Sequence, residues 1–223
     1  MSAVTDDKNP TGITLTQEQK DESERQGYWY HAIEYGLDYY VSGRFATAHR
    51  FIPVSANILH HAVEMLLKAC LAHDDQIATI REYWKLYRHD IRLLWQEFKA
   101  RQSAPVASEF DAFVEGLHKF EDIRYPETLV QMGATISLGP FECEGPPITR
   151  NGQVPENSYF LMLPQIDRLM GLLFDASRAN PEAFLPRVRD DEHSMIHYNM
   201  LRQTLFGRPK MSPQEIAAQA LQL

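Results

Sequence analysis

Residues 57–68 read Asn-Ile-Leu-His-His-Ala-Val-Glu-Met-Leu-Leu-Lys, and the expected fold follows from this stretch. Its apolar residues recur at the three- and four-residue spacing of an amphipathic helix. Asn57, His61, Glu64 and Lys68 follow the same spacing and form a polar stripe along that helix. A helix with a broad apolar face must bury it against other elements, so the stretch predicts one member of a helical bundle.

Helical patterns lie on both sides of this central helix along the chain. Thr16 and Gln19 form a capping box, which begins a long helix that we expect to end near Phe51. After the central helix, apolar residues recur at helical spacing within residues 91–98, 110–120 and 166–174. We therefore expect an all-α fold, an antiparallel up-down helical bundle of four to five main helices over residues 16–180.

Three segments depart from the bundle pattern. Residues 1–15 are polar and are expected to be a disordered lead-in, and residues 181–223 are expected to form a C-terminal helical extension. Residues 126–157 hold five Pro and four Gly, alternate in polarity over 134–138, and carry an Asn-Gly turn at 151–152. This pattern predicts a small β-hairpin-like insertion, which is either a lid or binding loop or else a surface loop or dimer arm.

Composition excludes several classes of protein. The chain has 223 residues, of which 44% are hydrophobic, and this suits a single globular domain. No apolar run approaches the ~20 residues of a membrane span, and the N-terminal residues show no secretory signal. The two cysteines are too few for a disulfide framework. We therefore expect a cytoplasmic protein with no membrane partner.

The formal net charge of −8 is unevenly distributed. Residues 44–101 hold nine of the 22 basic residues, six acidic residues and five of the nine histidines. This basic, His-rich centre can attract a small anion, although the acidic protein as a whole repels polyanions. The alternative is that these charges point in different directions on solvated surfaces.

Metal and cofactor motifs are not evident in the sequence. His193 and His197 have the i, i+4 spacing of a shared metal ligand pair, but no further ligand is apparent near them. There is no phosphate-binding Gly loop and no dinucleotide fingerprint. We therefore expect no metal and no cofactor.

Three short motifs, in their order along the chain, resemble the HEPN superfamily of helical-bundle proteins. They are Ala-Val-Glu-Met-Leu-Leu-Lys-Ala at 62–69, His89-Asp90-Ile91 followed by Leu94, and Arg-Tyr-Pro at 124–126. The resemblance covers roughly residues 25–178 and implies an antiparallel bundle of four or five helices that forms a homodimer. Many members of the superfamily are metal-independent ribonucleases or toxins, whereas others bind nucleotides or partner proteins.

The ribonuclease members carry an Arg followed, after four to six residues, by a His on the last bundle helix. Arg168 lies on that helix here, but Leu173, Phe174 and Asp175 occupy the positions where the His would stand. The resemblance therefore favours a non-catalytic bundle that binds a small anionic or nucleotide-like ligand or a partner protein. The candidate ligand-binding residues are Asn57, His61, Glu64, Lys68, His89 and Arg124.

In such a pocket the cationic side chains would hold phosphate, and Tyr125 or Trp84 would stack on a base. The alternative function is a metal-independent endoribonuclease that acts on RNA, with His61 as its base or with a displaced Arg187–His193 pair. A third interpretation is a helical scaffold without a ligand. The polar stripe would then be an ordinary helix face whose ion pairs contribute only ~0.2–0.5 kcal/mol each.

Overall fold

The computed structural model describes residues 15–49, 51, 54–72, 85, 87–101, 108–125, 127, 130–131, 135–139 and 158–184. Helices dominate this part of the chain, which confirms the predicted all-α bundle. They are α1 (Gln17–Ala48), α2 (Val54–Ala72), α4 (Ile91–Arg101), α5 (Asp111–His118), α7 (Leu163–Ala176) and the short α8 (Pro181–Phe184). Two 3₁₀ turns, η1 (Ser108–Phe110) and η2 (Lys119–Glu121), flank α5.

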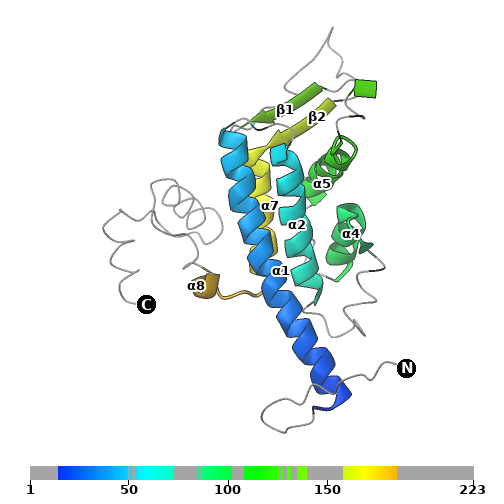
Figure 1. Ribbon diagram of the computed structural model, residues 1–223, viewed down its shortest axis with the longest axis vertical. Helices are drawn as coiled ribbons and strands as arrows, with labels where there is room; N and C mark the ends of the chain where they lie inside the picture. Colours follow the sequence, from blue (N-terminus) through cyan, green and yellow to red (C-terminus); the bar gives the residue numbers. More distant parts are fainter. Residues whose placement is uncertain are drawn as a thin grey trace, which may run out of the picture.

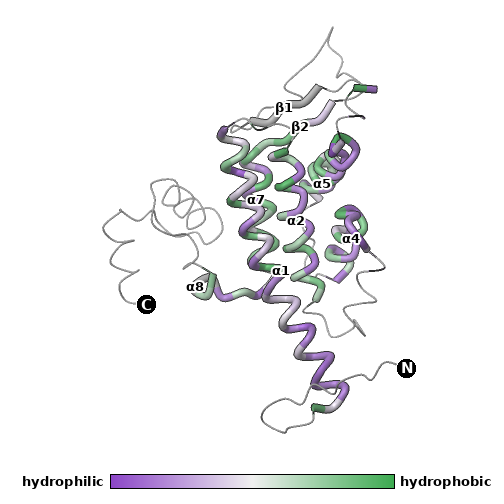
Figure 2. The backbone as a smooth tube through the Cα atoms, in the orientation of Figure 1, coloured by the Kyte–Doolittle hydropathy of each residue, from purple (hydrophilic) through white to green (hydrophobic). Residues whose placement is uncertain are grey.

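Helix α2 lies at the centre of the bundle (Figure 1). It contacts α1 on one side, α4 and α5 on another, and α7 on a third, and α1 runs antiparallel to it. Apolar side chains of these helices form one buried core cluster, and Figure 2 shows apolar stretches in each of the helices. Because α2 is covered from several directions, most of its residues are buried, including polar ones.

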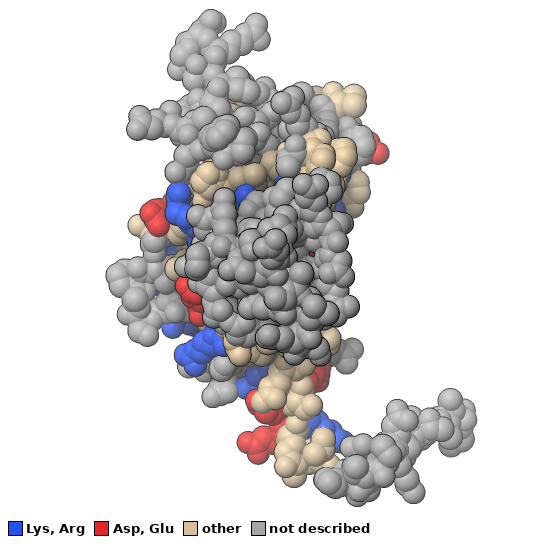
Figure 3. All heavy atoms as spheres, turned by 90° about the vertical axis from the view of Figure 1, so that its left-hand side faces the viewer, with Lys and Arg blue, Asp and Glu red and all other residues tan. Residues whose placement is uncertain are grey.

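Local sequence signals explain where α1 begins and how it continues. The Thr16 hydroxyl accepts from the Gln19 backbone N–H at 3.2 Å, and the Gln19 side chain accepts from the Thr16 backbone N–H at 2.9 Å. The predicted capping box is therefore confirmed. The first turns of α1 extend beyond the other helices and are polar (Figures 1 and 2). Figure 3 shows acidic and basic side chains mixed on this protruding end.

Polar contacts fasten α1 to α7. The Tyr40 hydroxyl donates to Asp167 Oδ1 at 2.5 Å, and the Arg44 guanidinium pairs with the same carboxylate. Farther down the bundle, Trp29 Nε1 donates to the Ser177 carbonyl oxygen at 3.0 Å. Burial raises the pKa of Tyr40 well above its usual value, so the phenol remains the proton donor of its contact at neutral pH.

Gly43 permits the close approach of α1 to α2. A Cβ atom at this position would lie 2.6 Å from Cγ and Cδ2 of Leu59, which is fully buried. We expect overpacking in Gly43→Ala to lower the free energy of unfolding by about 1–3 kcal/mol. The higher helix propensity of alanine offsets ~1 kcal/mol of this loss. Denaturant unfolding followed by circular dichroism would measure the change.

Gly27→Ala is the matched control for this prediction, because Gly27 lies on the same helix and has no atom within 4 Å of the added Cβ. This variant is expected to be stabilised by up to about 1 kcal/mol. Equal effects at the two positions would contradict the close packing of Gly43 against Leu59.

The strands differ from the expected hairpin. β1 (Thr135–Gly139) and β2 (Ser158–Met162) pair in parallel, with Thr135 opposite Ser158 and Gly139 opposite Met162. A parallel pair requires a crossover connection rather than a tight turn, so the alternation at 134–138 predicted a strand but not its partner. β2 leads directly into α7 and places the pair at one end of the bundle (Figure 1). The Asn-Gly turn at 151–152 lies outside the described residues.

Several further expectations fall on residues that the structure does not describe. These are the lead-in before residue 15, most of the insertion at 126–157 and the extension beyond residue 184. Among the described helices, none combines the length and the hydropathy that crossing a membrane requires.

Candidate functional site

The polar stripe of α2 points into the protein at Glu64 and Lys68, whereas Asn57 and His61 are only partly buried. Glu64 and Lys68 are both fully buried, and Lys68 Nζ donates to Glu64 Oε1 at 2.5 Å. The interpretation of these two residues as an ordinary solvated pair is therefore wrong. A charged side chain is buried only when it is paired and hydrogen-bonded, so this part of α2 is a built polar site within the core.

Two histidines from different parts of the chain converge on the same carboxylate. His61 Nδ1 lies 3.1 Å from Glu64 Oε2, and His89 Nδ1 lies 2.9 Å from Glu64 Oε1. Their ring centroids are 6.3 Å apart. We call Glu64, Lys68, His61 and His89 the Glu64 cluster.

Glu64 remains ionised in this environment. Burial alone would raise the pKa of its carboxyl, but the hydrogen bond from His61 and the neighbouring Lys68 ammonium outweigh burial and lower the pKa to about 2. An ionised carboxylate only accepts hydrogen bonds. Both imidazoles therefore carry a proton on Nδ1, and their Nε2 atoms are available for other partners.

The turn before α4 brings His89 to this carboxylate. Asp90 caps the helix, because its Oδ1 accepts from the backbone N–H groups of Arg92 and Leu93 at 2.9 and 3.3 Å. Arg88, on the other side of His89, has a φ of 42°, which non-glycine residues seldom adopt. The His-Asp-Ile motif is therefore a tight turn and a helix cap that together position one imidazole.

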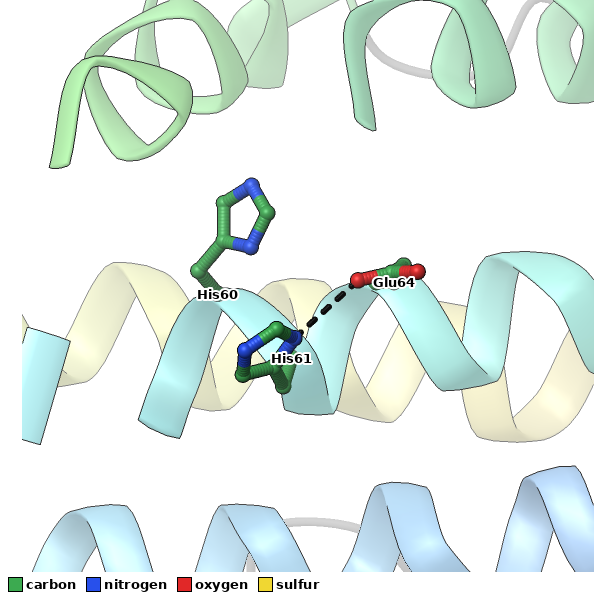
Figure 4. Close-up of side chains that lie close together, drawn as sticks. All are labelled: His60, His61 and Glu64. Carbon is green, nitrogen blue, oxygen red and sulfur yellow. Dashed lines mark hydrogen bonds and ion pairs between the residues drawn. The ribbon is translucent and has the colours of Figure 1, made fainter. Parts of the chain in front are cut away.

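The second histidine of α2 points elsewhere. Figure 4 shows His60 rising from α2 toward the neighbouring helices, while His61 lies beside the Glu64 carboxylate. His60 is fully buried, and its Nδ1 lies 3.3 Å from Glu121 Oε1 of η2. The His118 ring of α5 is 6.0 Å away. Burial lowers the pKa of His60 to about 3, so its imidazole is neutral.

Sequence reasoning did not select His60 for the site, although a signal was present. Ala56, Val63 and Leu67 lie four residues before it, three after it and seven after it. A histidine in the middle of such an apolar face is buried when the helix packs. Tyr39 of α1 was also not selected; its ring lies 5.7 Å from the His61 ring and is 40% exposed.

The structure brings together only part of the predicted ligand-binding set. His61, Glu64, Lys68 and His89 are in contact, as described above. Asn57 is partly buried one turn earlier on α2, and its Oδ1 makes no hydrogen bond to the described residues. Arg124 pairs with Glu121 at 3.5 Å, and its guanidinium lies 5.9 Å from the centroid of the exposed Tyr125 ring. Among the described residues, neither of these two contacts reaches the Glu64 cluster.

The sequence also drew attention to two other groups. Arg187 and His193 lie outside the described residues. Cys70 donates its thiol hydrogen to the Leu173 carbonyl oxygen at 3.1 Å, and burial raises the pKa of this thiol. A buried thiol of this kind is a packing residue rather than a nucleophile.

Chemically, the Glu64 cluster presents two imidazole rings of fixed orientation. They lie beside a buried, ionised carboxylate whose charge is balanced by the Lys68 ammonium. Side chains so held can donate to an anion or exchange protons with it. Comparisons of the chain with protein-family models, with curated proteins and with solved structures found no match.

Proposed function

We propose that this chain is a non-catalytic, HEPN-like bundle that binds a small anionic, nucleotide-like ligand at the exposed edge of the Glu64 cluster. One observation carries the proposal, the convergence of two imidazoles from separate segments on one buried carboxylate. The resemblance in sequence to the HEPN superfamily further suggests a homodimer. A particle of ~26 kDa by light scattering would count against that dimer.

The two histidines supply the contacts to an anion. The His89 side chain is 63% exposed and that of His61 is 23% exposed, so a ligand can reach both. Because Glu64 holds each ring at Nδ1, protonation of a ring places its second N–H on Nε2. Two such donors form charge-assisted hydrogen bonds to a phosphate or carboxylate group. Lys68 is too deeply buried to touch the ligand and instead neutralises Glu64.

Tyr39 supplies a surface for a base. Its ring neighbours the His61 ring and remains partly exposed on α1. Stacking of a base on an aromatic ring is worth ~1–3 kcal/mol and tolerates any base. A nucleoside monophosphate would therefore place its phosphate against the histidines and its base against Tyr39.

Calorimetric titration with adenosine and guanosine monophosphates, in the presence of a chelator, would test this proposal. We expect His61→Ala and His89→Ala each to weaken binding about tenfold, equivalent to ~1.4 kcal/mol. His31→Ala is the matched control, because His31 on α1 also places its Nδ1 2.9 Å from the carboxylate of a buried glutamate three residues along its helix. Absence of binding at millimolar ligand, or equal losses in the control, would contradict the proposal.

The same geometry supports a second candidate function, a metal-independent endoribonuclease. Carboxylate-oriented imidazoles are the groups that general acid–base cleavage of RNA requires at the 2′-hydroxyl and the leaving oxygen. Incubation of labelled RNA with the protein and a chelator tests this function. Cleavage that is lost in His61→Ala and retained in His31→Ala would replace the binding function with the catalytic one.

A further inference from the structure

Unpaired polar atoms gather where α2 packs against η2. Neither ring nitrogen of His60 makes a hydrogen bond to the described residues, although the residue is fully buried. Glu121 Oε1, 3.3 Å from His60 Nδ1, and Asn57 Oδ1 are likewise buried without a hydrogen bond. Buried polar atoms are nearly always satisfied, so this group of atoms is suited to hold an ion or a water molecule.

The chemistry of these atoms restricts the kind of species that they can bind. Carboxylate and amide oxygens supply lone pairs only, and a neutral imidazole supplies one lone pair and one N–H. The site therefore calls for a species that accepts lone pairs.

His60 also forms a trio of potential metal ligands with two members of the Glu64 cluster, His61 and Glu64. One ligand atom from each of His60, His61 and Glu64 lies within 4.8 Å of the other two (Figure 4). His61 Nδ1 and Glu64 Oε2 are 3.1 Å apart. Two ligands of a tetrahedral zinc ion, at bond lengths of ~2.0–2.1 Å, lie ~3.3 Å from each other. The distance between His61 Nδ1 and Glu64 Oε2 is thus already close to that between two zinc ligands.

We propose that His60, His61 and Glu64 bind a divalent transition-metal ion of the zinc class between α2 and its neighbours. Two imidazoles and one carboxylate suit zinc or cobalt and do not suit magnesium or calcium, which prefer oxygen ligands. Three protein ligands leave a fourth position for water or for a ligand.

Binding changes the protonation of one ligand. His61 Nδ1 now donates to Glu64 Oε2, so the proton on Nδ1 must leave before that nitrogen binds metal. It is replaced by a proton on Nε2, which the partly exposed ring can take from solvent. His61 stays neutral overall, and the metal takes the place of the His61–Glu64 hydrogen bond.

Lys68 opposes the metal, because its ammonium lies 2.5 Å from Glu64 Oε1. Removal of this charge should favour a cation at the same carboxylate. Lys68→Met should therefore bind metal at least tenfold more tightly than the wild type, whereas His60→Ala should bind at least tenfold more weakly. The two variants act in opposite directions, so general damage to the fold cannot reproduce both results.

The experiment is a titration of the full chain, without a polyhistidine tag and after chelator treatment, with zinc by calorimetry and with cobalt by visible absorption. We expect one ion per chain, with the d–d bands of a four-coordinate cobalt site and no sulfur charge-transfer band. His31→Ala is the matched control and should bind metal like the wild type, because its Nδ1–Glu34 contact repeats the His61–Glu64 geometry outside the trio.

Absence of binding, equal affinity in His60→Ala, or an affinity in Lys68→Met no tighter than that of the wild type would each overturn the metal proposal. If His60→Ala does not fold, Lys68→Met decides alone. The metal site shares His61 and Glu64 with the proposed anion site but does not depend on it. Metal is titrated here without nucleotide, and nucleotide is titrated above with a chelator, so either proposal can fail separately.

Discussion

Replacement of Glu64 by alanine is expected to lower the free energy of unfolding by about 3–5 kcal/mol. The change leaves the Lys68 ammonium buried without its 2.5 Å partner and removes the common acceptor of His61 and His89. Breaking one side of a buried ion pair typically has this cost, because the remaining charge stays buried after its counter-ion is removed. For a chain of this size the loss corresponds to a fall in Tm of roughly 6–20 °C.

Denaturant unfolding in the presence of a chelator would measure this loss. The informative comparison is the double variant Glu64→Leu with Lys68→Met, which replaces both charges with apolar side chains of similar size. We expect it to recover most of the stability, because well-packed hydrophobic replacements of a buried ion pair are often neutral or stabilising. A single variant within about 1 kcal/mol of the wild type would show that Glu64 and Lys68 are not a buried pair.

Mild acid is expected to destabilise the protein through His60. Burial lowers the pKa of His60 to about 3 in the folded protein, whereas the ordinary value is 6.5. Between these two pH values, His60 is therefore protonated in the unfolded chain and neutral in the folded protein. Stability falls as the pH drops from about 6.5 toward about 3, by up to ~1.4 kcal/mol per pH unit. Between about pH 7.5 and about pH 5 the expected loss from His60 is about 2 kcal/mol.

Other titratable groups face His60, and their contribution to the pH dependence of stability must be separated from that of His60. They are Glu121 of η2, His118 of α5, His61 and Glu64 of α2, and His89 of the turn before α4. The pKa of Glu64 is lowered from 4.5 to about 2, so its own contribution is lost at more acidic pH than the window chosen. His60→Gln should therefore lose most of the difference between the two pH values, whereas His31→Ala should retain it. Equal pH dependence in His60→Gln and the wild type would contradict a buried neutral imidazole.

Local signals in the sequence predicted the helices well. The Thr16–Gln19 capping box marks the start of α1, and apolar residues at helical spacing mark α2, α4, α5 and α7. These signals work because capping and amphipathic periodicity involve residues within one or two turns of each other. The strand at 135–139 was also foreseen, but its parallel partner at 158–162 was not. Alternation in polarity predicts a strand but not the segment that pairs with it.

The site was predictable to the extent that its residues share one helix. Glu64 and Lys68, and His61 and Glu64, follow from i, i+4 and i, i+3 spacing, and the structure places both pairs in contact. Their burial was not predictable in this way, since spacing alone is equally compatible with a solvated face. Arg124, which the sequence grouped with them, instead pairs with Glu121.

Helical periodicity in the sequence thus identifies the helical segments and the polar residues that share one face of α2. Tertiary packing, by contrast, buries Glu64 and Lys68 on this face, brings His89 to Glu64 from 25 residues away, and places His60 among unpaired atoms. The physical reason is the central position of α2. Helical periodicity describes how residues are arranged around one axis, whereas burial and long-range pairing depend on which other helices cover each side of that axis.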